Sequence, residues 1–258
     1  MLAEGAAPVL LQARLLSAEV RLSMLTSFPE GGIAVVVGAH GGIGRAFLAT
    51  LARDRGFAQS IGLARHTTPP IDLLDEATIA ASAGHVGSLS QPVRLVIDAT
   101  GFLHNDRFQP EKSWRQLDAA HMGHAFAINA AGPALLMKHF LPLLPREGKA
   151  VFATLSAKVG SIADNELGGW WSYRAAKAAL NQFVRTASIE LARKRPQALC
   201  VALHPGTVDT GLSGPFAKTG LDVQTPEQSV TNLLGVLDRL GPADTGGLFT
   251  YAGDRLPW

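Results

Sequence analysis

Tyr173 and Lys177 stand four residues apart, a spacing that places both side chains on one face of a helix. Tyrosine ordinarily titrates near pH ~10, and a neighbouring ammonium favours the phenolate, so the pair predicts a tyrosine that exchanges a proton with a bound molecule. Further upstream, residues 37–44 read VGAHGGIG, directly after an apolar, β-branched run. Neither pattern is specific alone, but together they predict a dinucleotide held beside an acid–base tyrosine.

The glycine-rich loop has the spacing Gly38-x-x-x-Gly42-x-Gly44 and precedes a helical pattern. Glycines allow a tight turn and a close approach to a pyrophosphate, and the N-terminus of the following helix offers N–H groups and a favourable dipole. The alternative is a glycine-rich turn that binds no ligand. The strand before the loop and the helix after it make this alternative less favoured. The cofactor contacts expected here are Gly38, His40, Gly41, Gly42, Ile43 and Gly44.

Arg65 directly follows the apolar run 60–64, at a place where NAD-preferring enzymes usually carry an acidic residue for the ribose hydroxyls. A guanidinium there can form charge-assisted hydrogen bonds to a 2′-phosphate. The sequence therefore predicts NADP(H) as the cofactor, with NAD(H) less favoured, and a solvated loop arginine is the alternative interpretation. Further cofactor contacts are expected at the ends of other predicted strands, namely Asp72, Leu73, Ala99, Thr100, Gly101, Pro205, Gly206, Val208 and Thr210.

The remaining catalytic roles fall to a lysine, an asparagine and a serine. Lys177 is expected to lower the pKa of Tyr173 and to hold a ribose hydroxyl. Asn129 is expected to fix a water molecule in a proton relay, through its carbonyl or its amide. The hydroxyl of Ser156 or Ser161 would polarise the substrate oxygen. The hydride itself comes from the cofactor.

The elements that must position these residues alternate between short apolar runs and longer helical patterns. Strands are predicted at 33–37, 60–64, 94–98, 150–155, 199–204 and 247–251, with a further strand that ends at 71–73. Helices are predicted at 44–55, 76–83, 113–144 with a break near Gly132-Pro133, 172–195 and 228–240. Continuous apolar strands separated by helices indicate an α/β fold: a single Rossmann-like, doubly wound parallel sheet with helices on both faces. Such sheets bind ligands beyond the carboxyl ends of their strands, where most of the motifs fall.

Composition excludes several classes of function. Of the 258 residues 47% are hydrophobic and 17% are charged, as in ordinary globular proteins, and the net charge of +2 gives no argument for nucleic acid or a membrane surface as partner. The single Cys200 excludes an internal disulfide and a multi-cysteine zinc site. No metal is expected, because His121 and His124 lack further ligands at a suitable spacing. No apolar run is long enough to span a bilayer, so a cytoplasmic location is expected.

Residues 1–30 are interpreted as an N-terminal appendage, either an extra helix or a disordered segment, and residues 31–258 as one domain. The segment 3–25 is rich in alanine and leucine, but charged residues interrupt it. It lacks the basic start and the clean apolar centre of a signal peptide.

These motifs resemble those of the short-chain dehydrogenase/reductase family, over about residue 33 to the C-terminus. The loop 37–44 is similar to the family's cofactor loop, with Val37 where threonine is usual, and Asp98–Gly101 is similar to its Asn-Asn-Ala-Gly segment in altered form. Within the family, the C-factor and Sniffer-type carbonyl reductases have segments similar to 160–165, 168–174 and 203–208. The resemblance implies a Rossmann-like domain, a Tyr-Lys-Ser-Asn active site and NADPH-linked carbonyl reduction, with a substrate-specificity loop at about 210–224.

The chain departs from this family pattern at one catalytic position. The family has two serines at the end of the fifth strand and uses the second, whereas the pair here is Ser156-Ala157. Either Ser156 serves, or Ser161 reaches in from the following loop. We favour Ser161, because its distance of twelve residues from Tyr173 is near the family's usual separation.

The sequence therefore predicts an NADP(H)-dependent oxidoreductase that interconverts a small carbonyl compound and an alcohol, with Tyr173 as general acid and base. A non-catalytic NADP(H)-binding protein that acts through a protein partner is the alternative, and an NAD-linked dehydrogenase is a third interpretation. The resemblance also implies a homodimer or homotetramer, since the tyrosine-bearing helix of this family commonly packs against a partner subunit.

Overall fold

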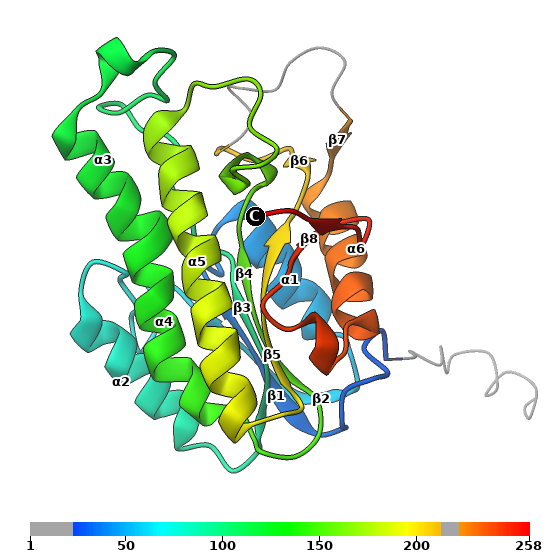
Figure 1. Cartoon of the computed structure of the whole chain (residues 1–258). Helices are drawn as coiled ribbons and strands as arrows, with labels where there is room; N and C mark the ends of the chain where they lie inside the picture. The colour runs from blue at the N-terminus through cyan, green and yellow to red at the C-terminus, as the bar shows by residue number, and fades with distance from the viewer. Residues whose placement is uncertain (1–22, 213–221) are drawn as a thin grey trace, which may run out of the picture.

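Six parallel strands and one antiparallel edge strand form the central sheet of the computed structural model, which describes residues 23–212 and 222–258 (Figure 1). The order across the sheet is β2 (Phe57–Leu63), β1 (Gly32–Val37), β3 (Val93–Asp98), β4 (Ala150–Leu155), β5 (Ala198–His204), β8 (Leu248–Thr250) and β9 (Arg255–Leu256). Among the strand pairs of the described residues, only β8–β9 is antiparallel. A separate parallel pair joins β6 (Thr207–Val208) to β7 (Val223–Gln224). The predicted parallel α/β fold is confirmed.

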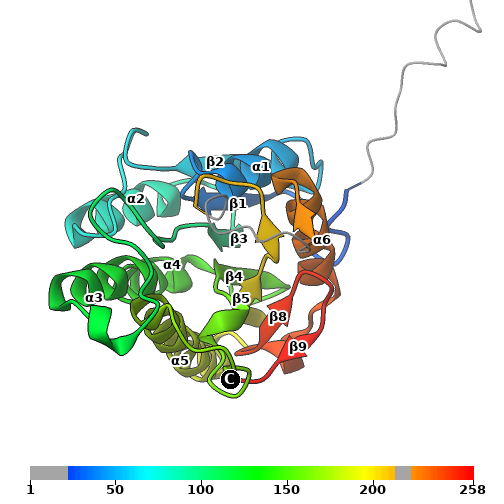
Figure 2. The same ribbon diagram turned by 90° about the horizontal axis from the view of Figure 1, so that it is seen from above.

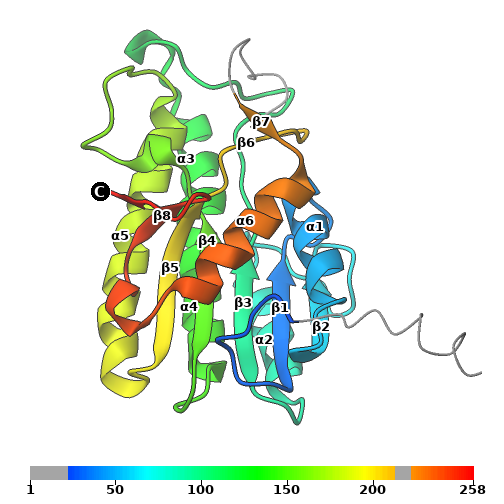
Figure 3. The same cartoon turned by 90° about the vertical axis from the view of Figure 1, so that its right-hand side faces the viewer.

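Helices cover both faces of this sheet, as the views from above and from the side show (Figures 2 and 3). One face carries α1 (Gly42–Leu51) and α6 (Pro226–Arg239). The other carries α2 (Glu76–Gly87), α4 (Gly132–Phe140) and α5 (Trp171–Lys194), with α3 (Ala119–Phe126) continuing into α4 beside α5. The predicted helices at 44–55, 76–83, 172–195 and 228–240 are therefore confirmed, apart from shifts of a few residues at their ends.

The two faces of the sheet bury two separate apolar cores. Along β1, Ala34 and Val36 point into the core beneath α1 and α6, while Ile33, Val35 and Val37 point into the core beneath α2, α4 and α5. This division follows from the alternation of side chains along a strand. A strand buried on both faces needs apolar residues at every position, which is why these strands read as continuous apolar runs.

Two predicted elements differ in the structure. Residues 71–73 do not end a sheet strand: Asp72 forms only an isolated bridge with Asp75. Pro69 and Pro70 precede this segment, and because proline has no N–H to donate, they oppose strand pairing there.

The long helix predicted at 113–144 is also divided. A short 3-10 helix at Trp114–Gln116 comes first, α3 then begins after Asp118, which caps it, and a π-helical turn at Ala127–Ala131 separates α3 from α4. This turn ends just before Gly132-Pro133, where the break was expected, since proline lacks the N–H that a continuous helix needs. A further 3-10 turn, Leu141–Leu143, follows α4.

Residues 23–30 pack onto the domain. The side chains of Leu25 and Phe28 are buried in the core beneath α1 and α6. The carboxylate of Asp54 accepts hydrogen bonds from Ser23 Oγ, from the Met24 backbone N–H and from the Gly56 backbone N–H, each at 2.8 Å. The rest of the predicted appendage, residues 1–22, lies outside the described residues. Within the described part of the chain, no helix combines the length and the apolar character needed to cross a membrane.

Candidate active site

The carboxyl ends of β1, β2 and β3 surround a pocket of about 620 Å³. This is the edge at which a doubly wound sheet binds its ligands. Three histidines not assigned from the sequence, His66, His104 and His124, also border it. Nine of the residues expected to contact the cofactor line the pocket: Gly38, His40, Gly41, Arg65, Asp72, Leu73, Ala99, Thr100 and Gly101.

Backbone packing explains why the loop that opens this pocket is rich in glycine. Gly38 has a φ of +81°, and a Cβ there would lie 3.0 Å from the carbonyl oxygen of Ala99. At Gly44 a Cβ would lie 2.1 Å from the carbonyl oxygen of Gly38. Neither position accepts a side chain without backbone movement. The glycine spacing of this loop therefore follows from the lack of room for a Cβ at Gly38 and Gly44.

The N-terminus of α1 suits an anion. The first helical turn reads Gly-Ile-Gly-Arg, and the N-cap residue Gly41 has no side chain with which to cap it. The first N–H groups of a helix have no intrahelical acceptor and carry the positive end of the helix dipole. The residues present therefore fit the pyrophosphate of a dinucleotide.

The outer rim of the pocket carries basic and aromatic groups. The side chains of Arg65 and His66 are exposed, and the His66 ring stacks on the His40 ring with centroids 6.4 Å apart. Asp72, which also lines the pocket, lies in a loop, where one carboxylate oxygen accepts the N–H of Leu74 at 3.0 Å. Asp72 therefore reaches the predicted position without the predicted strand.

The remaining expected cofactor residues are not among those that line this pocket. Ile43 packs against the core beneath α1 and α6, so its side chain does not face the pocket. Thr210 meets the loop, because a Cβ on Gly42 would lie 2.8 Å from its methyl carbon. After β5, the carbonyl of Pro205 accepts hydrogen bonds from Gln224 Nε2 and Ser229 Oγ. Gly206 adopts a φ of +79° and Val208 is buried. Residues 213–221 of the expected specificity loop lie outside the described residues.

Tyr173 and Lys177 occupy the first two turns of α5. The Lys177 ammonium is buried, lies 5.8 Å from the centre of the Tyr173 ring and donates a hydrogen bond to the carbonyl of Leu155 at 2.7 Å. Burial lowers the pKa of Lys177 to about 8, while the nearby carboxylate of Asp98 acts in the opposite direction. The lysine therefore keeps its charge at neutral pH with a small margin.

Burial raises the pKa of Tyr173 to about 12. The net shift is therefore upward, opposite in direction to the lowering expected from Lys177. The physical reason is that removal of the phenolate from water dominates, while the ammonium is engaged by the Leu155 carbonyl and attracted by Asp98. A tyrosine in this state holds its proton at neutral pH.

Asp98, which the sequence analysis did not assign to the site, ends β3 with a fully buried side chain. It accepts hydrogen bonds from the N–H and hydroxyl of Thr100, at 3.0 and 2.5 Å, and from the hydroxyl of Thr154 at 2.6 Å. Burial raises the pKa of Asp98, and these hydrogen bonds and Lys177 oppose that rise. An acidic residue directly after the apolar run Leu95–Ile97 was the signal that could have revealed it.

Asn129 lies in the π-helical turn and is fully buried. Its side-chain oxygen accepts the N–H of Phe102 at 2.9 Å, and its side-chain nitrogen donates to the carbonyl of Phe102 at 2.7 Å. A Cβ on Gly101 would lie 3.6 Å from the Asn129 oxygen and 3.9 Å from the Lys177 nitrogen. Gly101 therefore joins the pocket to the buried lysine and asparagine.

The two candidate serines are both buried, but they differ in their hydrogen bonds. The Ser156 hydroxyl donates to the side-chain oxygen of Asn181 in α5 at 2.7 Å. The Ser161 hydroxyl accepts the N–H of Asp164 at 3.2 Å, and among the described residues its own proton has no acceptor. Ser161 thus retains a proton that it can donate, whereas Ser156 does not. Ala157, between them, is half-buried.

This arrangement of sheet, loop and buried side chains agrees with the comparisons with known proteins. The family model described as Enoyl-(Acyl carrier protein) reductase matches residues 31–234. The chain belongs to the short-chain dehydrogenase/reductase family of oxidoreductases, as the sequence motifs predicted.

Particular relatives agree with the predicted group. The "C-signal" protein of Myxococcus xanthus is 39% identical over 143 residues, which cover 55% of this chain and 81% of that protein. The NADPH-bound carbonyl reductase from chicken fatty liver has a TM-score of 0.78 at 25% identity, covering 90% of this chain and 97% of that one. The carbonyl reductase Sniffer of D. melanogaster has a TM-score of 0.75 at 21% identity, covering 89% of this chain and all of that one, and shares the fold.

Proposed function

We propose that the protein is an NADP(H)-dependent oxidoreductase that interconverts a small carbonyl compound and an alcohol. The observation that carries the proposal is the convergence at Gly101, where the pocket of the glycine-rich loop meets the buried Lys177 and Asn129. The binding of NADPH by the carbonyl reductase from chicken fatty liver supports the choice of cofactor.

The residues of the pocket fit such a cofactor. The glycine-rich loop and the start of α1 would hold the pyrophosphate, and the exposed Arg65 would hold a 2′-phosphate, with His40 and His66 beside it. Lys177 would donate to a ribose hydroxyl. When bound, the nicotinamide supplies or accepts the hydride.

The proton in this proposal belongs to Tyr173. With a pKa of about 12, the phenol holds its proton at neutral pH and can donate it to a carbonyl oxygen as that oxygen gains negative charge. Because both side-chain groups of Asn129 bind Phe102, a relay water would be held by the Asn129 backbone carbonyl. Ser161 would donate its free proton to the substrate oxygen, in the role that Ala157 cannot fill.

A second candidate function rests on Ala157 itself. A protein that binds NADP(H) without turnover and acts through a protein partner would not need the serine that the family usually has there. The two candidate functions predict different effects of removing the Tyr173 hydroxyl, so an experiment can distinguish them.

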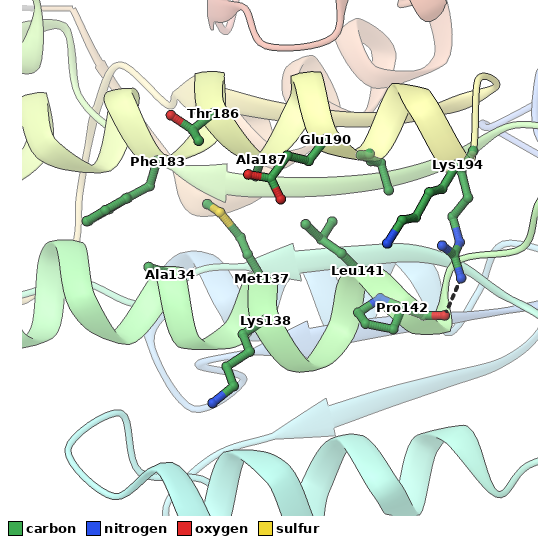
Figure 4. Close-up of a pocket in the computed structure, with 12 residues that line it drawn as sticks. Ala134, Met137, Lys138, Leu141, Pro142, Phe183, Thr186, Ala187, Glu190 and Lys194 are labelled. Atoms are coloured by element: carbon green, nitrogen blue, oxygen red, sulfur yellow. Dashed lines mark hydrogen bonds between the residues drawn. The ribbon is translucent and has the colours of Figure 1, made fainter.

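For the assembly, we propose a homodimer or homotetramer built on α4 and α5. A groove of about 400 Å³ runs between these helices and includes Met137, Leu141 and Phe183 (Figure 4). Phe183 and Ile189 on α5 are 41% and 44% exposed, so they offer apolar surface to a partner subunit. Light scattering with the purified protein tests this assembly. We propose residues 31–258 as the catalytic domain, onto whose core Leu25 and Phe28 pack. We propose the cytoplasm as the location of the protein, which cell fractionation tests.

The experiment for the function is a fluorescence titration with NADPH and with NADH, followed by a panel of aromatic and aliphatic ketones and aldehydes. The wild type should bind NADPH more tightly and oxidise it when a carbonyl substrate is present. Tyr173→Phe should keep the binding and lose turnover, by on the order of 10²–10⁴-fold. Binding without oxidation for every carbonyl compound would instead favour the non-catalytic function, and Ala157→Ser would then be the first variant to make.

A further inference from the structure

A buried carboxylate that the proposed reaction does not use lies against the start of the catalytic helix. Glu111, in the segment between β3 and α3, is 2% exposed. Its carboxylate accepts the backbone N–H of Ser172 at 3.2 Å and the Ser172 hydroxyl through a short hydrogen bond. Its backbone carbonyl accepts the N–H of Trp170 at 2.5 Å. Glu111 therefore binds Trp170 and Ser172, two of the three residues that precede Tyr173.

The start of α5 depends on such help from outside the helix. The residues that lead into it, Gly168, Gly169 and Trp170, have φ angles of 63°, 68° and 50°, so the chain enters the helix through three left-handed residues. A tryptophan at the N-cap offers no side-chain acceptor for the first N–H groups. A carboxylate in that place satisfies one of them and interacts favourably with the helix dipole. Glu111 supplies this cap from 61 residues upstream.

The same carboxylate is paired with a second buried side chain. His121 of α3 is 5% exposed, and its Nδ1 lies 3.2 Å from Glu111 Oε1. The His121 ring stacks on Phe108 with centroids 4.9 Å apart, and the edge of Phe102 meets it at 6.2 Å. Phe102 is the residue whose backbone binds the side chain of Asn129. The cluster thus connects the first turn of α5 to the surroundings of the predicted relay residue.

We propose that Glu111 is a positioning residue for Tyr173, and that His121 holds its carboxylate in place. This inference rests on the proposed function, since it concerns the placement of the proton donor in that reaction. Tyr173 follows Ser172 directly, so a shift of the capped turn moves the phenol relative to the substrate oxygen. Displacements of about 1 Å at a reacting group can cost on the order of 10²-fold in rate.

The test compares Glu111→Ala with Asp54→Ala. Asp54 is a suitable control because it is also a buried carboxylate that accepts three hydrogen bonds, but it lies at the amino end of β2, away from the pocket. Both variants should lower the melting temperature. Glu111→Ala should also lower kcat by about 10²-fold with the Kd for NADPH within about twofold, whereas Asp54→Ala should keep kcat at temperatures well below its melting point.

Hydrogen exchange supplies a readout that does not need turnover. The amides of residues 170–174 should exchange at least about tenfold faster in Glu111→Ala than in the wild type, and should be unchanged in Asp54→Ala. A kcat loss no larger than that of the control, or unchanged exchange at the start of α5, overturns the proposal. If the wild type binds NADPH but turns over no carbonyl compound, the proposed function fails. The hydrogen-exchange result alone then decides whether Glu111 stabilises the first turn of α5.

If Glu111→Ala does not fold, Glu111→Gln tests the positioning role of Glu111 instead. Glutamine keeps the length of the side chain but offers one acceptor oxygen in place of two. A kcat loss of about tenfold at an unchanged Kd for NADPH is expected, and a wild-type kcat overturns the proposal.

Discussion

Replacement of Lys177 by methionine should change how the stability of the protein depends on pH. The folded protein holds this lysine in a buried site, with its pKa lowered from 10.5 to about 8. At about 1.4 kcal/mol for each pKa unit, this difference is worth roughly 3 kcal/mol. Below pH 8 the buried charge makes the folded state less stable by that amount, and the penalty is relieved between about pH 8 and pH 10.5, where only the unfolded chain still binds the proton.

The sign follows from which state keeps the proton. Because the unfolded state binds more protons in this range, the free energy of unfolding of the wild type should rise with pH relative to that of Lys177→Met. Between pH 8 and pH 10 the expected relative gain is roughly 2 kcal/mol. The pKa values of Tyr173 and Cys200, both raised to about 12 by burial, affect the two proteins alike.

Urea unfolding curves of the two proteins at a series of pH values measure this difference. The lost hydrogen bond to the Leu155 carbonyl gives the variant a constant offset, which does not enter the slope. A difference in the free energy of unfolding between the two proteins that stays constant from pH 8 to pH 10 would refute the reasoning. Lys177 would then have the same pKa in the folded and the unfolded state. The same deprotonation should lower kcat of the wild type above about pH 8, since the site loses its ammonium.

Four further substitutions test other parts of the site. Ser161→Ala should lower kcat by about 10²-fold, which steady-state kinetics measure. Ser156→Ala should instead lower the free energy of unfolding by about 1 kcal/mol, because the hydrogen bond to Asn181 is lost, and melting curves measure this effect. Arg65→Ala should weaken NADPH binding by about tenfold and leave NADH binding unchanged, in titrations at low salt, and the effect should shrink at high salt because the guanidinium is exposed. Gly44→Ala should weaken binding of both nucleotides and lower the melting temperature, since its Cβ would lie 2.1 Å from the Gly38 carbonyl oxygen; calorimetry that finds normal NADPH binding would contradict this packing argument.

Features that depend on nearby residues could be predicted from the sequence. Strands such as β1 are buried on both faces, so they read as apolar runs, and their alternation with helices defines the parallel sheet. The glycine spacing of residues 38–44 reflects contacts within the loop and with the adjacent strand end. Tyr173 and Lys177 lie on one helix, so their spacing alone places them together. The assigned roles of these residues stay predictions.

Features set by distant contacts could not be predicted in this way. The pKa of Tyr173 depends on how deeply the folded chain buries its ring, which no local pattern records. The separation from Tyr173 favours Ser161 over Ser156, but only the position of Asn181 on α5 shows that the Ser156 proton is already used. Glu111 resembles an ordinary loop acid until its contact with Ser172 is known.

The contact between Glu111 and Ser172 also has a consequence for the order in which the protein folds. Between these residues lie α3, α4 and β4, so the contact joins residues 61 positions apart along the chain. Closing so long a loop costs chain entropy that is recovered only when the native contact forms, which slows such contacts relative to local helix formation. The turn that carries Tyr173 therefore reaches its final geometry late, after most of the secondary structure exists.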